Sequence, residues 1–250
     1  MRAPDWLTAR PVAHRGLHDL SRGIVENTPS AIRAAVEHGF SIEIDVQRTA
    51  DGEAIVHHDG ALGRLTEGRE ALASLTADRL KQVAFKQTAD RMVTLGELCD
   101  LIAGRSVLVV EIKSLFDGDV TLVKRVAEVL AAYQGPAVAM SFDPEQVAAL
   151  RHIAPNIVRG IVAQRRYDDG HWAEASSAQR RRMTTLRHAL ETQPHFVAYS
   201  VNDLPAPAPW IARHLFGCPL LTWTVRTPEQ RSRAARYADQ MIFEGFVPKS

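Results

Sequence analysis

Two carboxylates two positions apart, Glu43 and Asp45, stand in an apolar stretch that runs into the turn Thr49-Ala50-Asp51-Gly52. Strand side chains point to alternate faces, so both carboxylates share one face and the apolar residues around them share the other. The Asp-Gly turn folds the chain back into a second strand ending in His57-His58-Asp59, which brings His58 near the carboxylates. This stretch therefore predicts a divalent-cation site beside an acid/base group.

Ionisable groups end two more apolar runs. One run ends in His14-Arg15-Gly16 and the other in Glu111-Ile112-Lys113. Charged residues at the end of a buried strand are costly unless they serve a site there. In a parallel α/β barrel the carboxyl ends of the strands meet at one face, so we expect these groups to lie together.

Three carboxylates gathered at one barrel mouth need a counter-charge. Glu43, Asp45 and Glu111 could pair with Arg48 or Lys113, but three clustered carboxylates would still repel one another. Oxygen-ligated Mg²⁺ or Ca²⁺ explains them better, and no thiolate or histidine cluster favours zinc.

The strand count favours a closed barrel. Parallel neighbours need a crossover of a dozen or more residues, and only seven separate Val46 from Ala54, so 54–58 must return antiparallel as a hairpin. Eight runs then remain, which predicts an α/β fold with a single (β/α)₈ TIM barrel. The strand-like runs are 11–15, 41–46, 54–58, 107–113, 137–142, 157–163, 195–201, 219–225 and 240–244.

Helix signals fill the gaps between these runs. Thr94 with Glu97 forms a capping box, and Pro29, Pro144 and Pro228 occupy first-turn positions. The predicted helices are 29–38, 95–103, 118–133, 143–153, 176–190, 207–216 and 227–237. Residues 60–93, with a short helix at 77–83, form an insertion after the second barrel strand, and we expect it to be a lid within one domain spanning 1–250.

Composition narrows the function classes. The chain has 250 residues, 46% of them hydrophobic, which suits one barrel core. With 30 Lys and Arg against 29 Asp and Glu, its charge of +1 does not suggest a nucleic-acid partner. Cys99 and Cys218 lie in no paired motif and are expected to be reduced. The first six residues lack the apolar stretch of a signal peptide and no run is long enough to span a bilayer, so we expect a soluble, cytoplasmic protein without stable membrane insertion.

Histidines other than His14 and His58 are assigned structural or surface roles. His57 should point to the opposite face of its strand from His58. The others lie in helical or loop contexts without ionisable partners at useful spacing, which favours surface placement. They are His18, His38, His152, His171, His188, His195 and His214.

Eight short motifs occur along nearly the whole chain, and their order resembles that in the glycerophosphodiester phosphodiesterase family. The resemblance implies a TIM barrel that uses a divalent cation to hydrolyse glycerophosphodiesters, small-molecule substrates, to glycerol 3-phosphate and an alcohol. The motifs are His14-Arg15-Gly16, Glu26-Asn27-Thr28, Glu43-Ile44-Asp45-Val46, Thr49-Ala50-Asp51-Gly52, His58-Asp59, Glu111-Ile112-Lys113, Ser141-Phe142 and Trp223-Thr224-Val225.

The resemblance also implies roles for the catalytic groups. Glu43, Asp45 and Glu111 match the family's metal ligands. His14 and His58 match its acid/base pair, and which of them is the acid stays open. So does the nucleophile, which is either water or a neighbouring glycerol hydroxyl that first forms a cyclic phosphate.

Further residues match the substrate side of the family pattern. Arg15 and Lys113 resemble the cationic groups beside the phosphate, and Asn27 resembles a polar residue near the metal. Trp223 would either form a wall for the glycerol or pack in the core.

The chain departs from the family pattern in its last strand. Many members have a Thr-Asp or Thr-Asn pair before a proline, whereas this chain reads Phe243-Glu244-Gly245. Glu244 would then either bind a polar head group of the substrate or pair with a nearby arginine.

Two other functions stay open. A lysophospholipase D or sphingomyelinase D-like enzyme would share the barrel but act at a membrane, and it would need an exposed apolar rim. A catalytically silent binding protein would have no need of an acid/base pair. The oligomeric state and the preferred alcohol do not follow from the sequence.

Overall fold

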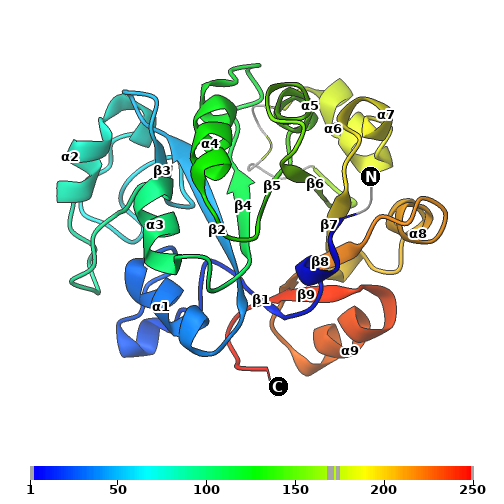
Figure 1. The fold of residues 1–250 in the computed structure, drawn as a ribbon, viewed down its shortest axis with the longest axis horizontal. Coiled ribbons are helices and arrows are strands. Elements are labelled where there is room, and N and C mark those ends of the chain that lie inside the picture. Colours follow the sequence, from blue (N-terminus) through cyan, green and yellow to red (C-terminus); the bar gives the residue numbers. More distant parts are fainter. Residues whose placement is uncertain (1–2, 168–171, 173–174, 249–250) are drawn as a thin grey trace.

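A computed structural model describes residues 3–167, 172 and 175–248. Its centre is a ring of eight parallel strands in the order β1-β9-β8-β7-β6-β5-β4-β2, closed by pairing of β1 with β2 (Figure 1). The predicted TIM barrel is therefore confirmed. The ring strands are β1 (Val12–Ala13), β2 (Ser41–Arg48), β4 (Leu108–Ile112), β5 (Ala137–Ser141), β6 (Val158–Ala163), β7 (Phe196–Ser200), β8 (Leu220–Val225) and β9 (Gln240–Phe243).

The extra strand β3 (Ala54–Val56) lies outside the ring and pairs antiparallel with β2, as predicted. Its other edge is not free, because Ile55 forms an isolated bridge with Thr94 and the Val56 amide donates to the Val93 carbonyl. The hairpin thus carries the chain from β2 back toward the mouth of the barrel, where His58 follows.

Helices surround the ring (Figure 1). α3 begins with the predicted capping box of Thr94 and Glu97, and α1, α5 and α9 begin at the predicted prolines. The helices are α1 (Pro29–Glu37), α2 (Ala77–Gln82), α3 (Leu95–Ile102), α4 (Thr121–Ala132), α5 (Pro144–Ile153), α6 (Ser177–Thr185), α7 (Ala189–Thr192), α8 (Pro207–His214) and α9 (Pro228–Tyr237).

The prediction of one helix over 176–190 is wrong. The segment forms α6 and α7, because Leu186 takes a left-handed conformation with φ of 51° that ends α6. α6 contains the basic run 180–182, and the mean hydropathy of this helix is low. Along the described residues of α6 and α7 there is thus no continuous apolar face that would favour a single longer helix.

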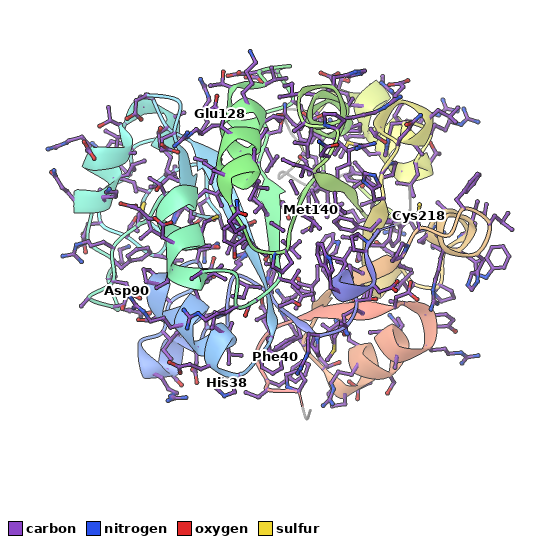
Figure 2. The ribbon with its side chains drawn as sticks, in the orientation of Figure 1. His38, Phe40, Asp90, Glu128, Met140 and Cys218 are labelled. Atoms are coloured by element: carbon purple, nitrogen blue, oxygen red, sulfur yellow. The ribbon has the colours of Figure 1, made fainter. Side chains whose placement is uncertain are left out.

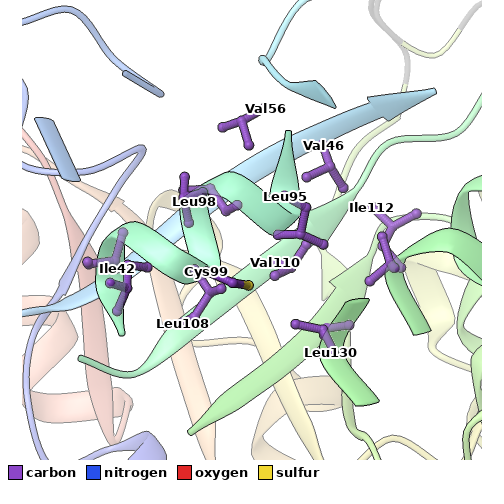
Figure 3. Close-up of a cluster of buried hydrophobic side chains, with 14 of the residues drawn as sticks. Ile42, Val46, Val56, Leu95, Leu98, Cys99, Leu108, Val110, Ile112 and Leu130 are labelled. Atoms are coloured by element: carbon purple, nitrogen blue, oxygen red, sulfur yellow. The ribbon is translucent and has the colours of Figure 1, made fainter. Parts of the chain in front are cut away.

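The barrel strands bury both of their faces. Ile42, Ile44 and Val46 of β2 point outward and pack against α3 and α4, while Val109 of β4 belongs to the cluster inside the ring. Figure 3 shows Leu95, Leu98 and Cys99 of α3 lying over this outer side, and Figure 2 places Met140, an inner-cluster residue, near the middle of the barrel. The alternation predicted for β2 is therefore present, and it turns Glu43 and Asp45 inward.

Residues 60–93 form a small apolar cluster together with Val25 and with Ile55 of β3. It comprises Val25, Ile55, Leu62, Leu72, Leu80, Phe85 and Met92. The apolar side chains of the insertion are thus largely absorbed by packing. That the insertion acts as a lid, and that residues 1–250 are one domain, stay predictions.

Several predicted placements of single residues need correction. His188 and His195 are buried, at 0% and 5% exposure, because they pack at α7 and at the start of β7. His18 lies at the barrel mouth beside Glu244. His171 lies outside the described residues.

Both cysteines are free, as expected: Cys99 is buried and Cys218 is half-buried. Within the described ranges, no helix combines the length and the apolar character needed to cross a membrane.

Candidate active site

The three predicted ligand carboxylates meet inside the mouth of the barrel. Glu43 and Asp45 come from β2 and Glu111 from the neighbouring β4, where Asp45 and Glu111 are register partners. Each of the three offers an oxygen atom within 4.8 Å of the others, and all three residues are buried. Strand pairing and side-chain alternation are sufficient to create this cluster.

Two cations and an amide surround Asp45. The Lys113 Nζ lies 2.7 Å from Asp45 Oδ1 and also contacts Glu111, and the Arg15 Nε lies 3.2 Å from Asp45 Oδ2. The Asn27 Nδ2 donates to Asp45 Oδ2 at 2.9 Å. Arg48, the other cation considered for this cluster, pairs instead with Asp119.

The charges divide the two β2 carboxylates into different states. Burial, reinforced by the negative charges of Asp45 and Glu111, raises the pKa of Glu43 well above its ordinary value. Burial also opposes ionisation of Asp45, but Lys113 and Arg15 outweigh it and hold the pKa of Asp45 well below its usual range. Asp45 is therefore ionised with its charge compensated by these cations, whereas at Glu43 the described cations do not outweigh burial and the neighbouring negative charges.

Glu43 also has an unused oxygen. Its Oε2 accepts from the Arg15 backbone amide at 3.0 Å, but its buried Oε1 has no hydrogen-bond partner among the described residues. Buried polar atoms are normally satisfied, so an unpaired oxygen inside a carboxylate cluster fits an oxygen-ligated cation. The residues present thus suit Mg²⁺ or Ca²⁺.

Unusual backbone geometry brings the loop residues to this cluster. Arg15 and Asn27 have φ of 56° and 57°, a left-handed conformation that non-glycine residues adopt at a cost. Gly16, at φ of 80°, touches α1 so closely that an added Cβ would lie 2.8 Å from the carbonyl carbon of Ala31. The His-Arg-Gly motif therefore depends on glycine to seat Arg15 against the carboxylates.

Each predicted acid/base histidine has a carboxylate partner on Nδ1. His14 Nδ1 lies 2.5 Å from Glu244 Oε2, and His58 Nδ1 lies 2.8 Å from Asp59 Oδ1. The Nε2 of His14 lies 3.9 Å from Glu43 Oε2. Burial lowers the pKa of His14, although its hydrogen bond to Glu244 acts in the opposite direction. His57 points elsewhere and packs near Phe85.

An arginine stands behind each of these two carboxylates. The Arg226 Nε lies 2.6 Å from Glu244 Oε1, and the Arg64 Nε lies 2.6 Å from Asp59 Oδ2. Burial opposes ionisation of both carboxylates, but hydrogen bonds to their histidines and the nearby arginines hold both pKa values low.

Among the described residues, His18, Glu26, Arg64 and Arg226 lie beside the site's ionisable groups but were not predicted from the sequence as functional. Glu26 accepts from Arg15 at 2.7 Å and from Arg64 at 2.7 Å, so it joins the insertion to the His-Arg-Gly motif. Glu26 stands in a quoted motif, but Arg64 and Arg226 lie in segments with no motif, and only the fold brings them here.

Two cavities open beside the cluster. The smaller, about 230 Å³, is lined by both His14 and His58 and by Glu43, Glu111 and Trp223. The larger, about 670 Å³, extends past His58 and Lys113 to an aromatic wall. That wall consists of Phe116, Phe142, Trp172 and Trp223.

Trp223 contributes to both cavities. Its Nε1 donates to the Ala198 carbonyl at 3.1 Å, and its ring packs edge-on against Phe142 with centroids 5.3 Å apart. The structure thus brings together all ten residues singled out in the sequence, although their roles stay predictions.

Known proteins with similar sequences are phosphodiesterases. A glycerophosphodiester phosphodiesterase of Caldanaerobacter subterraneus is 32% identical over 165 residues, which cover 61% of this chain and 66% of that protein. Glycerophosphodiester phosphodiesterase 1 of Bos taurus is 25% identical over 162 residues, covering 60% of this chain and 48% of the bovine protein. The matched region therefore spans less than two thirds of these relatives' own length.

Solved structures share the fold. A phosphodiesterase of Oleispira antarctica, in complex with the product sn-glycerol-3-phosphate, has a TM-score of 0.75 at 19% identity, covering 93% of this chain and 91% of that one. A structure from Silicibacter pomeroyi described as a putative glycerophosphoryl diester phosphodiesterase has a TM-score of 0.76 at 24% identity, covering 94% and 89%. Residues 14–247 match one family over nearly the full length, and the chain belongs to the glycerophosphoryl diester phosphodiesterase family.

Proposed function

We propose that this chain is a glycerophosphodiester phosphodiesterase that hydrolyses its substrate to glycerol 3-phosphate and an alcohol, with Mg²⁺ or Ca²⁺ held by Glu43, Asp45 and Glu111. The observation that carries the proposal is the convergence of this carboxylate cluster with two carboxylate-bound histidines on one cavity. Family membership supports the reaction class, and the sn-glycerol-3-phosphate in the Oleispira antarctica structure supports the product.

In this proposal the cationic side chains bind the phosphate. Lys113 and Arg15 both line the larger cavity, and each also contacts Asp45, which fixes its position before substrate arrives. Charge that gathers on the phosphate oxygens in the transition state would thus meet fixed positive groups. A divalent cation, when bound, supplies further positive charge at these oxygens.

The two histidines move the protons. One removes a proton from the attacking hydroxyl or water, and the other protonates the leaving alkoxide. Their Nδ1 atoms face Glu244 and Asp59, so each imidazole has only Nε2 left for substrate. The same arrangement serves attack by water or by a neighbouring glycerol hydroxyl.

We place this activity in glycerol and lipid metabolism in the cytoplasm, on soluble glycerophosphodiesters. The aromatic wall of Phe142 and Trp223 is the proposed contact surface for the organic part of the substrate.

The test is a chemical assay of the purified chain. Glycerophosphocholine, glycerophosphoethanolamine and glycerophosphoglycerol are supplied separately, and released glycerol 3-phosphate is measured before chelation, after it, and after adding back Mg²⁺ or Ca²⁺. We expect hydrolysis that chelation abolishes and one of the cations restores. Glu43→Gln should remove the activity, whereas Glu229→Gln, which changes an exposed carboxylate on α9, should not.

Two results would contradict the proposal. Full hydrolysis after elemental analysis shows that the metal is gone would exclude the cation. No hydrolysis of any of the three diesters with either cation would exclude the activity, and cleavage of a lysophospholipid instead would assign the chain to a membrane-directed phospholipase D reaction.

A further inference from the structure

Glu244 occupies the position where the chain departs from the family pattern, and it touches the acid/base machinery rather than open solvent. Its Oε2 lies 2.5 Å from His14 Nδ1, and its Oε1 lies 2.6 Å from Arg226 Nε. Both oxygens of the carboxylate therefore have partners from this chain. A third group, His18 Nε2, lies 3.7 Å from Oε2, beyond hydrogen-bonding distance.

The arrangement repeats the one around the other histidine. His58 Nδ1 faces Asp59, and the second oxygen of Asp59 faces Arg64. Two sets of side-chain contacts, each linking an arginine to a carboxylate and the carboxylate to a histidine, thus meet at the same cavity from separate parts of the fold. The carboxylate beside His58 is the next residue of the chain, whereas the one beside His14 directly follows β9 and is 230 residues away.

We propose that Glu244, held by Arg226, is a positioning residue that fixes the ring orientation and the tautomer of His14. An ionised carboxylate can only accept hydrogen bonds, so His14 must carry a proton on Nδ1 to bond it. In the neutral imidazole the lone pair then lies on Nε2, the atom that faces Glu43 and the cavity. This role takes the place of the head-group contact considered from the sequence, and its kinetic part rests on the proposed function.

Arginine makes the arrangement directional. Arg226 has only donor groups, so its contact with position 244 favours a side chain that turns an acceptor toward it. A glutamate has a second acceptor left for His14. A glutamine has none, because its oxygen would face Arg226 and its NH₂ group would face His14 Nδ1. His14 Nδ1 would then have to accept, and the proton of the neutral ring would move to Nε2.

The experiment compares His14 in the full-length wild type, Glu244→Gln and the double variant Arg226→Ala/Glu244→Gln. Nitrogen chemical shifts of the His14 ring, measured by NMR at one fixed pH where the ring is neutral, report which nitrogen carries the proton. We expect the Nδ1–H form in the wild type and the Nε2–H form in Glu244→Gln. Without Arg226 the amide is free to turn its oxygen to His14, so the double variant should return toward the wild-type tautomer.

Kinetics on glycerophosphodiesters give a second readout. Glu244→Gln should lower kcat by roughly 10²-fold or more with KM and Mg²⁺ affinity unchanged, since an orienting carboxylate acts on the histidine and not on substrate binding. The double variant should recover part of that loss. Glu229→Gln, an exposed carboxylate in the first turn of α9, is the matched control and should behave as the wild type.

The two proposals fail separately. If the wild type cleaves no glycerophosphodiester, the proposed function fails, yet the NMR comparison still decides the role of Glu244. An unchanged His14 tautomer in Glu244→Gln would overturn the positioning role. So would a kinetic loss confined to KM, or to substrates with one kind of alcohol, because either would place Glu244 in contact with the substrate.

Discussion

At the scale of single residues, the carboxylates Glu43 and Asp45 lie on the same strand but have different partners. Asp45 contacts Lys113, Arg15 and Asn27 and is held ionised by the two cations. Glu43, in contrast, has one buried oxygen without a hydrogen-bond partner in the part of the chain that the structure describes. The first stabilises the charged interior, and the second offers an unpaired oxygen. Because both residues lie on the same face of β2, the sequence pattern does not distinguish them, and only their contacts in the structure do.

Asp45→Asn should therefore destabilise the fold more than Glu43→Gln. Removing the Asp45 charge leaves Lys113 with Glu111 alone and Arg15 with Glu26 alone, which should cost up to roughly 3–5 kcal/mol. Removing Glu43 relieves repulsion from Asp45 and Glu111, so in chelator its effect should be small or stabilising. Urea unfolding of both variants in excess chelator checks this. Equal losses of unfolding free energy would contradict the division of duties.

His58→Ala should lower kcat by roughly 10²–10⁴-fold, the usual worth of a positioned proton-transfer group. His57→Ala should leave kcat of the folded enzyme near the wild-type value, because His57 packs near Phe85 and points away from the active-site cavity. Steady-state kinetics on protein of verified melting temperature measures both. A kcat loss for His57→Ala as large as that for His58→Ala would place the wrong histidine in the site.

Alternation and strand ends were enough to predict the carboxylates and the two histidines of the site, because both are local properties of the sequence. Asn27, Trp223 and Glu244 were singled out only by comparison with the family pattern. The carboxylates of β2 and β4 meet as expected from register alone. Arg64 and Arg226 could not be predicted, since an arginine in a loop carries no signal until the fold brings its carboxylate within reach. His188 was misplaced for a related reason: its burial depends on how α7 packs, which the sequence does not reveal.

At the scale of elements, the Arg64 side chain connects the insertion to the site. Arg64 contacts both Asp59 and Glu26, and Glu26 in turn contacts Arg15. The buried apolar side chains of the insertion pack with Val25 and with Ile55 of β3. The position of the insertion was predicted from the strand count, but this connection was not.

Arg64→Ala should lower kcat/KM by roughly fivefold, the equivalent of about 1 kcal/mol for partly exposed ion pairs. The change frees Asp59 and Glu26 to move and so loosens His58 and Arg15. Its effect should weaken at high salt, which screens the wild-type contacts. Arg69→Ala, which removes an exposed arginine of the same insertion, is the control. Loss of the same size in both variants would mean that general charge, not this contact, matters.

At the scale of the whole molecule, buried histidines make the fold sensitive to acid. Burial, with Arg182 nearby, lowers the pKa of His188 to about 4, against an ordinary value near 6.5 in the unfolded chain. Between these pH values the unfolded state binds the proton and the folded state does not. Stability is therefore fully present above pH 6.5 and is lost as the pH falls toward 4.

His188 alone should cost about 2 kcal/mol of unfolding free energy between pH 7 and pH 5. In His188→Gln that part of the pH dependence should vanish, whatever the stability of the variant at pH 7. Urea unfolding at several pH values measures the slope. His152→Gln, which changes an exposed histidine of α5, should keep the wild-type slope, and a wild-type slope in His188→Gln would show that this residue does not titrate as proposed.

The barrel itself was predictable because eight strand-like runs, separated by helical crossovers, are compatible with few closed topologies. The break between α6 and α7 was not, since it depends on a left-handed Leu186 that no sequence signal marks. The barrel thus follows from local patterns that repeat along the chain, whereas a departure such as the break after α6 depends on the backbone conformation of a single residue.

The bond between His14 and Glu244 joins positions 230 residues apart, and it has a consequence for how the protein is made. The ring closes only when β9 pairs with β1, and the same strand delivers Glu244 to His14. A nascent chain that has emerged only through α9 already carries all three cluster carboxylates and both acid/base histidines, but it has neither a closed barrel nor an oriented His14. Under the proposed role of Glu244, activity would thus begin only once β9 has left the ribosome, so that nascent chains ending before β9 stay inactive.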